Sequence, residues 1–472
     1  MALKLLKDTI RKATDPLEAA VLGNDYFLLQ QSLNYPDKFN VIWQDIQLRL
    51  RSRSNTFQPE ITFLLYSKAC ERLLVPIILD LLKRPEVKEK GIQVNLIVLF
   101  GIHRLKLSPS NLEKLQALGC PVQTDYFSLI RACHQPEQKL VVLCLDHRRP
   151  YVYHFWGVET VDTLKRFGVR TLSIQHGGTR ADSVEDLASA ASDIVLVWGK
   201  RVYREIVEKY GGDPQRFRIV GNPLHDRLAQ INPDEALKKL TDRYPTLQSQ
   251  LPQKRIILLA TTLQAEYAAW SDEQALYRQY MQQIYSNLDF SKYILLVKMH
   301  PLDSLSPNIY RDEIPNAQIE SSVVVIEPSV TELDVYSLLS ISELLITRAS
   351  TVAEEALIMG RRVVAFDLMP EGPSKNYKHL EEYGDFTTVY QDAKPDLETV
   401  IDQVMSQSVQ EGSSDHQSTI VKELTHCLDG KSTDRATNEI LHHLFKPDLI
   451  SDQDNNHSRT KNLGDLHERL RC

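Results

Sequence analysis

Two series of short, almost uninterrupted apolar runs, separated by helix-forming stretches, constrain the fold of this chain more than any other feature. The first series contains the runs at residues 61–66, 94–100, 140–145, 169–174, 194–198 and 217–223. The second contains the runs at residues 256–260, 294–297, 323–326, 344–346 and 363–366. A half-exposed strand alternates apolar and polar residues, whereas a run that is apolar throughout is typical of a parallel strand with helices on both faces. The sequence therefore predicts an α/β fold with two Rossmann-like, doubly wound domains.

The length and the polar stretches predict where the domains begin and end. A chain of 472 residues is too long for one ordinary core. We expect an N-terminal Rossmann-like, acceptor-side domain at 1–228, a polar, helix-forming linker with three prolines at 229–252 and a C-terminal, nucleotide-binding domain at 253–445. Residues 406–419, rich in Ser and Gln, predict a flexible loop, and residues 446–472 predict a disordered tail. Two such domains face each other across a cleft, and ligands bind there at the carboxyl ends of strands.

Composition excludes several classes of protein. The net charge of -7 argues against a nucleic-acid-binding protein. No apolar run reaches the roughly 18 residues that predict a transmembrane helix, and the six scattered cysteines are typical of a reducing cytoplasm. Residues 1–12 have an apolar helical face flanked by lysine and arginine. They predict either a peripheral contact with the inner face of the plasma membrane or an ordinary N-terminal helix packed on the body.

The turn that follows the run at 344–346 predicts a phosphate-binding site. Hydroxyls of Thr347, Ser350 and Thr351, the guanidinium of Arg348 and the first amides of the next helix all converge there. Helix N-termini of this kind attract anions. The alternative is an ordinary helix start.

The two glutamates that follow this turn are expected to act differently. Residues 351–354 form a capping-box pattern, which would tie Glu354 to its own helix start. Glu355 has no such duty and is expected to accept hydrogen bonds from a sugar or a ribose.

Two histidines lie within three residues of the ends of apolar runs. His176, followed by Gly177 and Gly178, comes after the run at 169–174, where glycines allow a ligand to approach the backbone. Its imidazole titrates near neutrality and could act as a general base towards an acceptor hydroxyl, and a structural histidine in a tight turn is the alternative. His300 follows the run at 294–297, and Lys298 or His300 is expected to point into the cleft and stabilise a departing diphosphate.

These motifs resemble those of GT-B fold, nucleotide-sugar-dependent proteins of bacterial surface-polymer synthesis. The resemblance is to CDP-glycerol glycerophosphotransferases, capsule-type glycosyltransferases and UDP-N-acetylglucosamine 2-epimerases, and it covers residues 61–445. It is carried by His176–Gly177, by residues 220–226 with Asn222, by residues 298–301, by residues 347–355 and by residues 429–435. It implies that His176 acts as base, that His300 lies near the donor phosphates and that the last helix crosses back to the first domain.

The sequence also departs from these families. Glycerophosphotransferases usually have an acidic residue and paired serines where this chain has Arg348, Ala349, Ser350 and Thr351, and the arginine suggests a different donor. The basic turns of the epimerases are absent. No phosphate-loop, hydrolase-elbow or zincin motif is present, so we expect neither a cofactor nor a metal.

The predicted function is therefore a metal-independent transferase of surface-polysaccharide or glycolipid synthesis. It would move a glycosyl or glycerophosphoryl group from a nucleotide-activated donor to a hydroxyl of a glycan or lipid-linked glycan. Two alternatives remain open, a nucleotide-sugar 2-epimerase and a non-catalytic nucleotide-binding protein.

Overall fold

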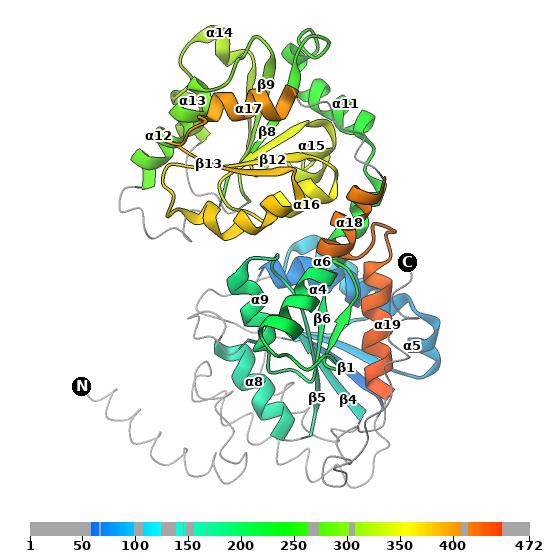
Figure 1. Cartoon of the computed structure of the whole chain (residues 1–472). Helices are drawn as coiled ribbons and strands as arrows, with labels where there is room; N and C mark the ends of the chain where they lie inside the picture. The colour runs from blue at the N-terminus through cyan, green and yellow to red at the C-terminus, as the bar shows by residue number, and fades with distance from the viewer. Residues whose placement is uncertain are drawn as a thin grey trace, which may run out of the picture.

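The computed structural model consists of two α/β domains placed end to end, with the C-terminal domain above the N-terminal domain in Figure 1. It describes residues 58–65, 68–98, 107–123, 138–144, 146–147, 155–166, 168–262, 273–301, 307–406 and 414–445. The predicted membrane-contacting segment at 1–12 and the predicted tail at 446–472 lie outside these residues. No helix among the described residues combines the length and the apolar character needed to cross a bilayer.

The N-terminal domain is built on one parallel sheet with the strand order β3-β2-β1-β4-β5-β6-β7. Its strands are β1 (Glu60–Leu65), β2 (Gln93–Val98), β3 (Val122–Gln123), β4 (Lys139–Leu143), β5 (Arg170–Ile174), β6 (Ile194–Val197) and β7 (Phe217–Ile219). The helices that flank it are α4 (Lys68–Lys83), α5 (Pro85–Glu89), α6 (Pro109–Ala117), α8 (Phe155–Arg166), α9 (Ala181–Ala188) and α10 (Lys200–Arg204). The strands are almost wholly buried because helices cover both faces, which explains their continuous apolar sequences.

The C-terminal domain repeats this plan with the strand order β10-β9-β8-β11-β12-β13. Its strands are β8 (Arg255–Ala260), β9 (Tyr293–Lys298), β10 (Val323–Ile326), β11 (Leu344–Thr347), β12 (Arg362–Asp367) and β13 (Phe386–Tyr390). Its helices are α12 (Glu273–Ser286), α13 (Pro307–Asp312), α14 (Ala317–Glu320), α15 (Val335–Ile341), α16 (Val352–Ile358), the 3-10 helix η6 (Pro373–Tyr383) and α17 (Leu397–Ser406).

Both sheets have the strand order of doubly wound, Rossmann-like domains, in which the order reverses at a switch point next to the first strand. The predicted fold class is confirmed. The switch points lie between β1 and β4 in the first domain and between β8 and β11 in the second. Ligands of such sheets bind outside the carboxyl ends of the strands at these points.

The segment expected to be a polar, helix-forming linker is largely helical and packs on the C-terminal domain. It contains α11 (Pro233–Arg243) and the short 3-10 helix η4 (Pro245–Leu247). Leu240 and Leu247 are fully buried in the core of that domain. Pro233 and Pro245 each stand at the first position of a helix, where proline is well tolerated. The change of domain falls earlier, at the 3-10 helix η3 (Pro223–Gln230).

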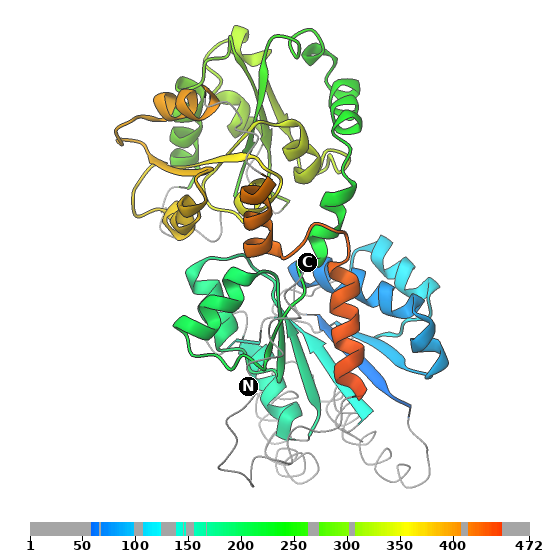
Figure 2. The same ribbon diagram turned by 45° about the vertical axis from the view of Figure 1, so that its right-hand side comes forward.

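Two C-terminal helices return the chain from the second domain to the first. Helix α18 (Ser414–Thr425) contacts both α10 and α16, and α19 (Ser432–Phe445) packs against α4. Figures 1 and 2 both show α19 alongside the sheet of the N-terminal domain. The flexible loop expected at 406–419 is therefore wrong for residues 414–419, which form the first half of α18. Residues 407–413 lie outside the described part.

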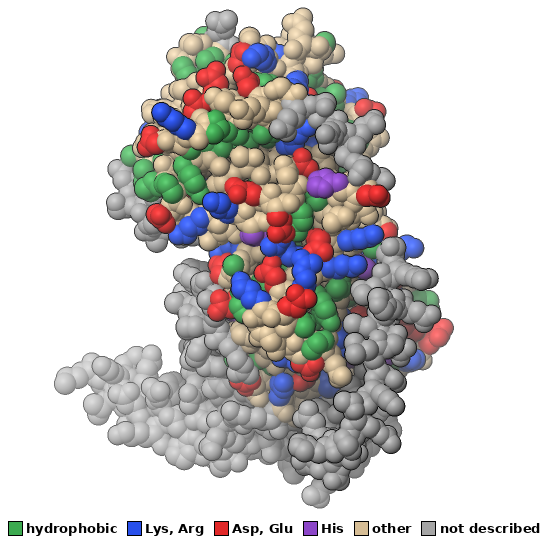
Figure 3. Space-filling view, viewed as in Figure 1, with side chains coloured by type: hydrophobic (Ala, Val, Ile, Leu, Met, Phe, Trp, Pro, Cys, Tyr) green, Lys and Arg blue, Asp and Glu red, His purple; other side chains and the backbone are tan. Residues whose placement is uncertain are grey.

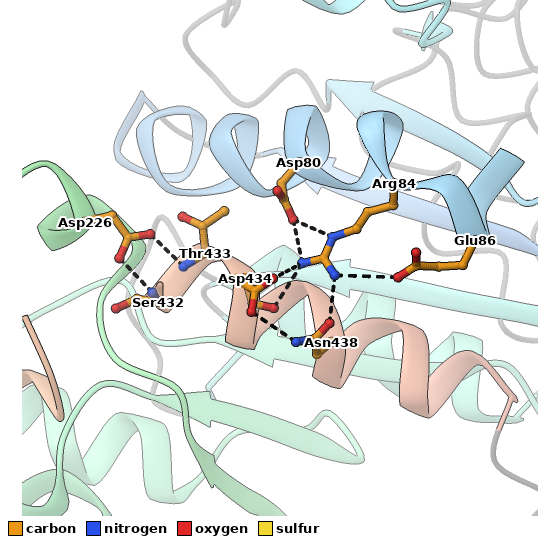
Figure 4. Close-up of polar contacts among 8 residues, drawn as sticks. All are labelled: Asp80, Arg84, Glu86, Asp226, Ser432, Thr433, Asp434 and Asn438. Atoms are coloured by element: carbon orange, nitrogen blue, oxygen red, sulfur yellow. Dashed lines mark hydrogen bonds and ion pairs between the residues drawn. The ribbon is translucent and has the colours of Figure 1, made fainter. Parts of the chain in front are cut away.

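The start of α19 is tied to the point where the chain changes domain. The carboxylate of Asp226 accepts hydrogen bonds from the backbone N–H groups of Ser432 and Thr433, both at 2.7 Å. Arg84, which lies between α4 and α5, holds the same helix further along through Asp434 and Asn438 (Figure 4). Two motifs that lie about 200 residues apart in the sequence, residues 220–226 and residues 429–435, thus form one structural unit.

Replacing Asp226 by alanine should lower the thermal unfolding midpoint of the protein. The change leaves two N–H groups of the first turn of α19 without their acceptor, a loss of about 1–2 kcal/mol. Asp242→Ala is a suitable control, because Asp242 makes only an exposed ion pair with Lys238 and should cost less than about 0.5 kcal/mol. Equal midpoints for the two variants would contradict the role given to Asp226.

Candidate active site

A cavity of about 400 Å³ lies between the two domains, and both contribute to its walls. The N-terminal domain and the hinge helix η3 provide Arg72, His176, Trp198, Asn222, Leu224 and Arg227. The C-terminal domain provides, among others, Thr261, Lys298, His300, Ser350, Thr351 and Glu355. Most of these residues follow the carboxyl ends of strands. In each sheet these strand ends lie near the switch point, so the residues share one region.

His176 stands two residues beyond the end of β5 and is held by the turn around it. The buried Gln175 donates a hydrogen bond from its amide to the carbonyl of Gly177 at 2.7 Å. Its amide oxygen accepts one from the backbone N–H of Trp198 at 2.8 Å. Behind His176 lies the buried His147, with the two rings nearly parallel and their centroids 6.2 Å apart. These contacts hold the backbone and the imidazole of His176 at the cavity wall of the first domain.

Gly178, the second glycine after His176, is needed for close approach between the domains. A Cβ at Gly178 would lie 2.2 Å from Oε1 of Glu354, which belongs to α16 of the other domain. Gly177 has more space, since its Cβ would lie 3.5 Å from the hydroxyl of Ser183.

Asn222 is buried and lines the cavity from the start of η3. Its side-chain oxygen accepts from the N–H of Leu224 at 3.0 Å, and its amide nitrogen lies 2.9 Å from Nε2 of His225. Both groups of the Asn222 side chain therefore have partners within the hinge.

The second domain supplies His300, two residues beyond the end of β9. The backbone N–H of His300 donates to the hydroxyl of Thr261 at 2.8 Å, which fixes the exit of the strand. Lys298 also lines the cavity, but its ammonium donates to the carbonyls of Glu327 and Val330 at 3.3 and 3.1 Å. Burial lowers the pKa of Lys298 below the usual lysine value. Lys298 or His300 was expected to reach a ligand here. The ammonium of Lys298 instead binds two carbonyls of the loop that follows β10 and so holds that loop in place.

The turn after β11 differs from the prediction in two residues. Ser350 and Thr351 line the cavity, whereas Thr347 and Arg348 do not. The hydroxyl of Thr347 donates to the carbonyl of Ala260 at 3.2 Å. Nε of Arg348 donates to Asp367 at 3.0 Å, and both side chains of this pair are buried. The arginine that suggested a different donor is thus neutralised within the domain, because the end of the neighbouring strand β12 brings a carboxylate beside it.

The free helix amides expected at this turn are also occupied. The N–H of Val352 donates to the hydroxyl of Ser350 at 3.3 Å, and the N–H of Ala353 donates to the carbonyl of Ser350. The N–H groups of Glu354 and Glu355 both donate to the carbonyl of Thr351. Since α16 has only seven residues, its dipole is small, and the hydroxyls of Ser350 and Thr351 are what the turn offers to a ligand.

The capping box predicted at residues 351–354 does not form. Thr351 makes no side-chain cap hydrogen bond, and Glu354 accepts from the N–H and the hydroxyl of Thr179 in the other domain, at 2.6 and 3.0 Å. Glu355 lines the cavity, and one of its oxygens accepts from the hydroxyl of Tyr336 at 2.8 Å.

Sequence reasoning missed several polar residues of the cavity wall, among them Arg72 and Arg227. Arg72 lies in the first part of α4, just after β1 at the switch point, and its position after a buried strand was the signal that could have revealed it. It is exposed and has neither a hydrogen bond nor an ion pair with any residue that the structure describes. Arg227 pairs with Asp334 across the hinge and lies over the ring of Tyr336.

Charged side chains also gather on the outside where the two domains meet (Figure 3). Arg201 of α10 pairs with Glu382 of η6, and Arg204 pairs with Glu423 of α18. Among the described residues, no group of three or more His, Cys, Asp and Glu side chains is arranged to hold a metal ion.

Two Rossmann-like domains with one cavity between them define the GT-B class of fold. The sequence model of the CDP-glycerol:poly(glycerophosphate) glycerophosphotransferase family matches residues 147–441 of this chain. The match spans more than half of the chain, which belongs to this family and is an enzyme of the transferase class. The comparison with curated proteins gave no match.

Several solved structures are similar in fold. A putative UDP-N-acetylglucosamine 2-epimerase from Listeria monocytogenes is 15% identical with a TM-score of 0.51, covering 83% of this chain and 98% of its own. The UDP-GlcNAc 2-epimerase from Neisseria meningitidis, bound to UDP-GlcNAc, is 12% identical with a TM-score of 0.51, covering 81% and 100%. The wall teichoic acid polymerase TagF is 15% identical with a TM-score of 0.46, covering 87% and 98%. At these identities the likeness to the two epimerases shows the fold alone.

Proposed function

We propose that this enzyme transfers a glycerophosphoryl group from CDP-glycerol, or from a closely related nucleotide-activated donor, to a hydroxyl of a glycerophosphate-containing acceptor. The observation that carries the proposal is a cavity between the domains that is lined by His176 of one domain and by His300, Ser350, Thr351 and Glu355 of the other. Membership of the glycerophosphotransferase family supports the class of donor and acceptor.

The donor is assigned to the C-terminal side of the cavity. Glu355 is a carboxylate within the cavity and can accept hydrogen bonds from ribose hydroxyls. The hydroxyls of Ser350 and Thr351 can donate to the diphosphate. His300 lies on the same wall and can donate to the phosphate of the departing nucleotide, where negative charge develops.

The acceptor is assigned to the N-terminal side, where His176 acts as general base. The acceptor oxygen attacks the phosphorus that carries the glycerol, and its proton passes to the imidazole of His176. The bond between this phosphorus and the bridging oxygen breaks, and CMP leaves with the electron pair. Because the reacting groups come from both domains, the cavity is complete only when the domains are together, and this excludes water as a competing acceptor.

The test is a donor panel with the purified full-length protein. CDP-glycerol with a short glycerophosphate oligomer should release CMP and extend the oligomer, and omission of the oligomer should nearly abolish CMP release. Transfer from a UDP-sugar instead would replace the proposal by glycosyl transfer. Conversion of a UDP-sugar into its epimer without any acceptor would replace it by epimerisation.

The proposed reaction needs no metal ion, because the charge on the leaving nucleotide is offset by side chains of the cavity. We expect turnover to be unchanged after treatment with EDTA and not to rise when Mg²⁺ or Mn²⁺ is added. A tenfold or larger loss with EDTA that is restored by one of these ions would contradict this part of the proposal.

Arg72 is expected to recognise the negative charge of the acceptor. It reaches the cavity from the N-terminal domain and has no carboxylate partner among the described residues, so its charge is available to a phosphate. Arg72→Ala should raise KM for the oligomer about tenfold, and the affinity for the nucleotide should not change. Lys238→Ala, which removes a surface cation on α11, should leave both values unchanged. Equal losses of acceptor and nucleotide affinity in Arg72→Ala would contradict this assignment.

A further inference from the structure

A buried carboxylate joins the donor side of the cavity to the turn that carries His176. Glu354 belongs to α16, between the cavity residues Thr351 and Glu355, and is almost completely buried. One of its oxygens accepts both the backbone N–H and the hydroxyl of Thr179, a residue that lies three positions beyond His176. Glu354 is therefore a direct link between the walls of the cavity.

The packing around this link leaves little freedom. The missing side chain of Gly178 makes space for the carboxyl group, since a Cβ there would lie 2.2 Å from Oε1 of Glu354. The hydroxyl of Thr179 also lies 2.8 Å from Nε2 of His379, which belongs to η6 of the C-terminal domain. Thr179 is thus held by two side chains of the opposite domain, and the turn between it and His176 contains only two glycines.

The electrostatic surroundings fit a contact that persists near neutral pH. Burial raises the pKa of Glu354 to about 7, although the hydrogen bonds from Thr179 and the charge of Arg201 oppose this rise and Glu355 adds to it. Burial and Arg201 lower the pKa of His379 to about 4, so its ring is neutral at pH 7. The N–H of Thr179 can donate to Oε1 whether Glu354 is ionised or protonated on its other oxygen.

We propose that Glu354 is a positioning residue for the transfer reaction: it holds the turn 176–179 so that His176 faces the donor bound on the opposite wall. This inference rests on the proposed function for His176. Glu354 takes no part in the chemistry, because its carboxyl group is occupied by Thr179 and it is absent from the cavity wall. Its effect on the reaction passes through Thr179 and the two glycines to the imidazole.

The kinetic test compares Glu354→Ala with Glu354→Gln, with rates expressed per nucleotide-binding site so that misfolded protein does not count. Glu354→Ala should lower kcat at least tenfold, whereas Kd for CMP stays within twofold of the wild-type value. Glu354→Gln should recover most of the loss, because its amide oxygen can accept the same two hydrogen bonds. Thr179→Val, which removes only the hydroxyl, should show a smaller loss, and it should add nothing further in the Glu354→Ala background.

A matched control is Glu343→Ala, which removes a carboxylate paired with Arg255 inside the C-terminal domain. Its kcat should stay within twofold of the wild-type value. A wild-type kcat in Glu354→Ala would overturn the proposal. So would a loss of CMP affinity that matches the loss of kcat, since the effect would then lie on the donor side.

Hydrogen exchange separates this inference from the proposed function, because it needs no substrate. In Glu354→Ala the amides of residues 176–180 should exchange at least tenfold faster, and those of β6 should exchange at the wild-type rate. Unchanged exchange at residues 176–180 would refute the link even if the enzyme were active. Faster exchange there, in a protein that turns over no donor, would refute the transferase reaction and leave the link intact.

Discussion

Replacing His176 by alanine should reduce kcat about a hundredfold or more, the usual contribution of a positioned general base. The imidazole lies at the end of β5 on the acceptor wall of the cavity, where it can receive the proton of an attacking hydroxyl. The measurement is the rate of CMP release with saturating donor and acceptor. Because His176 is assigned to the acceptor side, Kd for CMP, measured by calorimetry, should not change.

His416→Ala is the matched control for this experiment. His416 is an exposed histidine near Asp385 on the C-terminal domain, and its removal should leave kcat within twofold of the wild-type value. If His176→Ala retained wild-type turnover, His176 would be a structural residue of its tight turn, and the mechanism would lose its base.

Replacing His300 by alanine should also lower kcat, by about 10²–10³-fold, as expected when a donor to developing negative charge is lost. The readout that distinguishes it from His176 is the affinity for the product. His300 is assigned to the phosphate of the departing nucleotide, so His300→Ala should weaken CMP binding several-fold, and His176→Ala should not.

Thr261→Val provides a graded comparison. It removes the hydroxyl that accepts from the backbone N–H of His300 but keeps the imidazole, so its loss of kcat should be smaller than that of His300→Ala. A full loss of turnover in His300→Ala without any change in CMP affinity would move His300 away from the leaving group.

Most of the strands could be predicted from the sequence because burial on both faces leaves a local signature. The run at 256–260 became β8 (Arg255–Ala260), and the run at 294–297 became β9 (Tyr293–Lys298). Two edge strands were not predicted, because neither has a continuous apolar sequence of several residues. Strand β3 has two residues, and β13 carries Thr387 and Thr388 in its centre because its edge position leaves them partly exposed.

Which residues lie at the ends of strands could be predicted from the sequence. Which partner each of their side chains binds could not. His176, His300, Ser350, Thr351 and Glu355 all follow strands and all line the cavity. Arg348 also follows a strand, but its guanidinium binds Asp367. The local sequence around Arg348 does not indicate this partner, which lies on the adjacent strand.

Glu354 shows the same limit. Its spacing from Thr351 fits a capping box, and only the arrival of Thr179 from the other domain gives its carboxyl group a different partner.

The sequence by itself determined the two parallel sheets and which residues stand at the ends of their strands, because apolar periodicity and turn residues act over a few positions. Only the tertiary structure decided which of those residues share the cavity and which side chains are held elsewhere. It joined Glu354 to Thr179 and Asp226 to the start of α19, contacts between residues about 175 and 206 positions apart. Such pairings depend on how one domain packs against the other. A hydrogen bond between the domains produces no periodic pattern in the amino-acid sequence, so the sequence does not predict it.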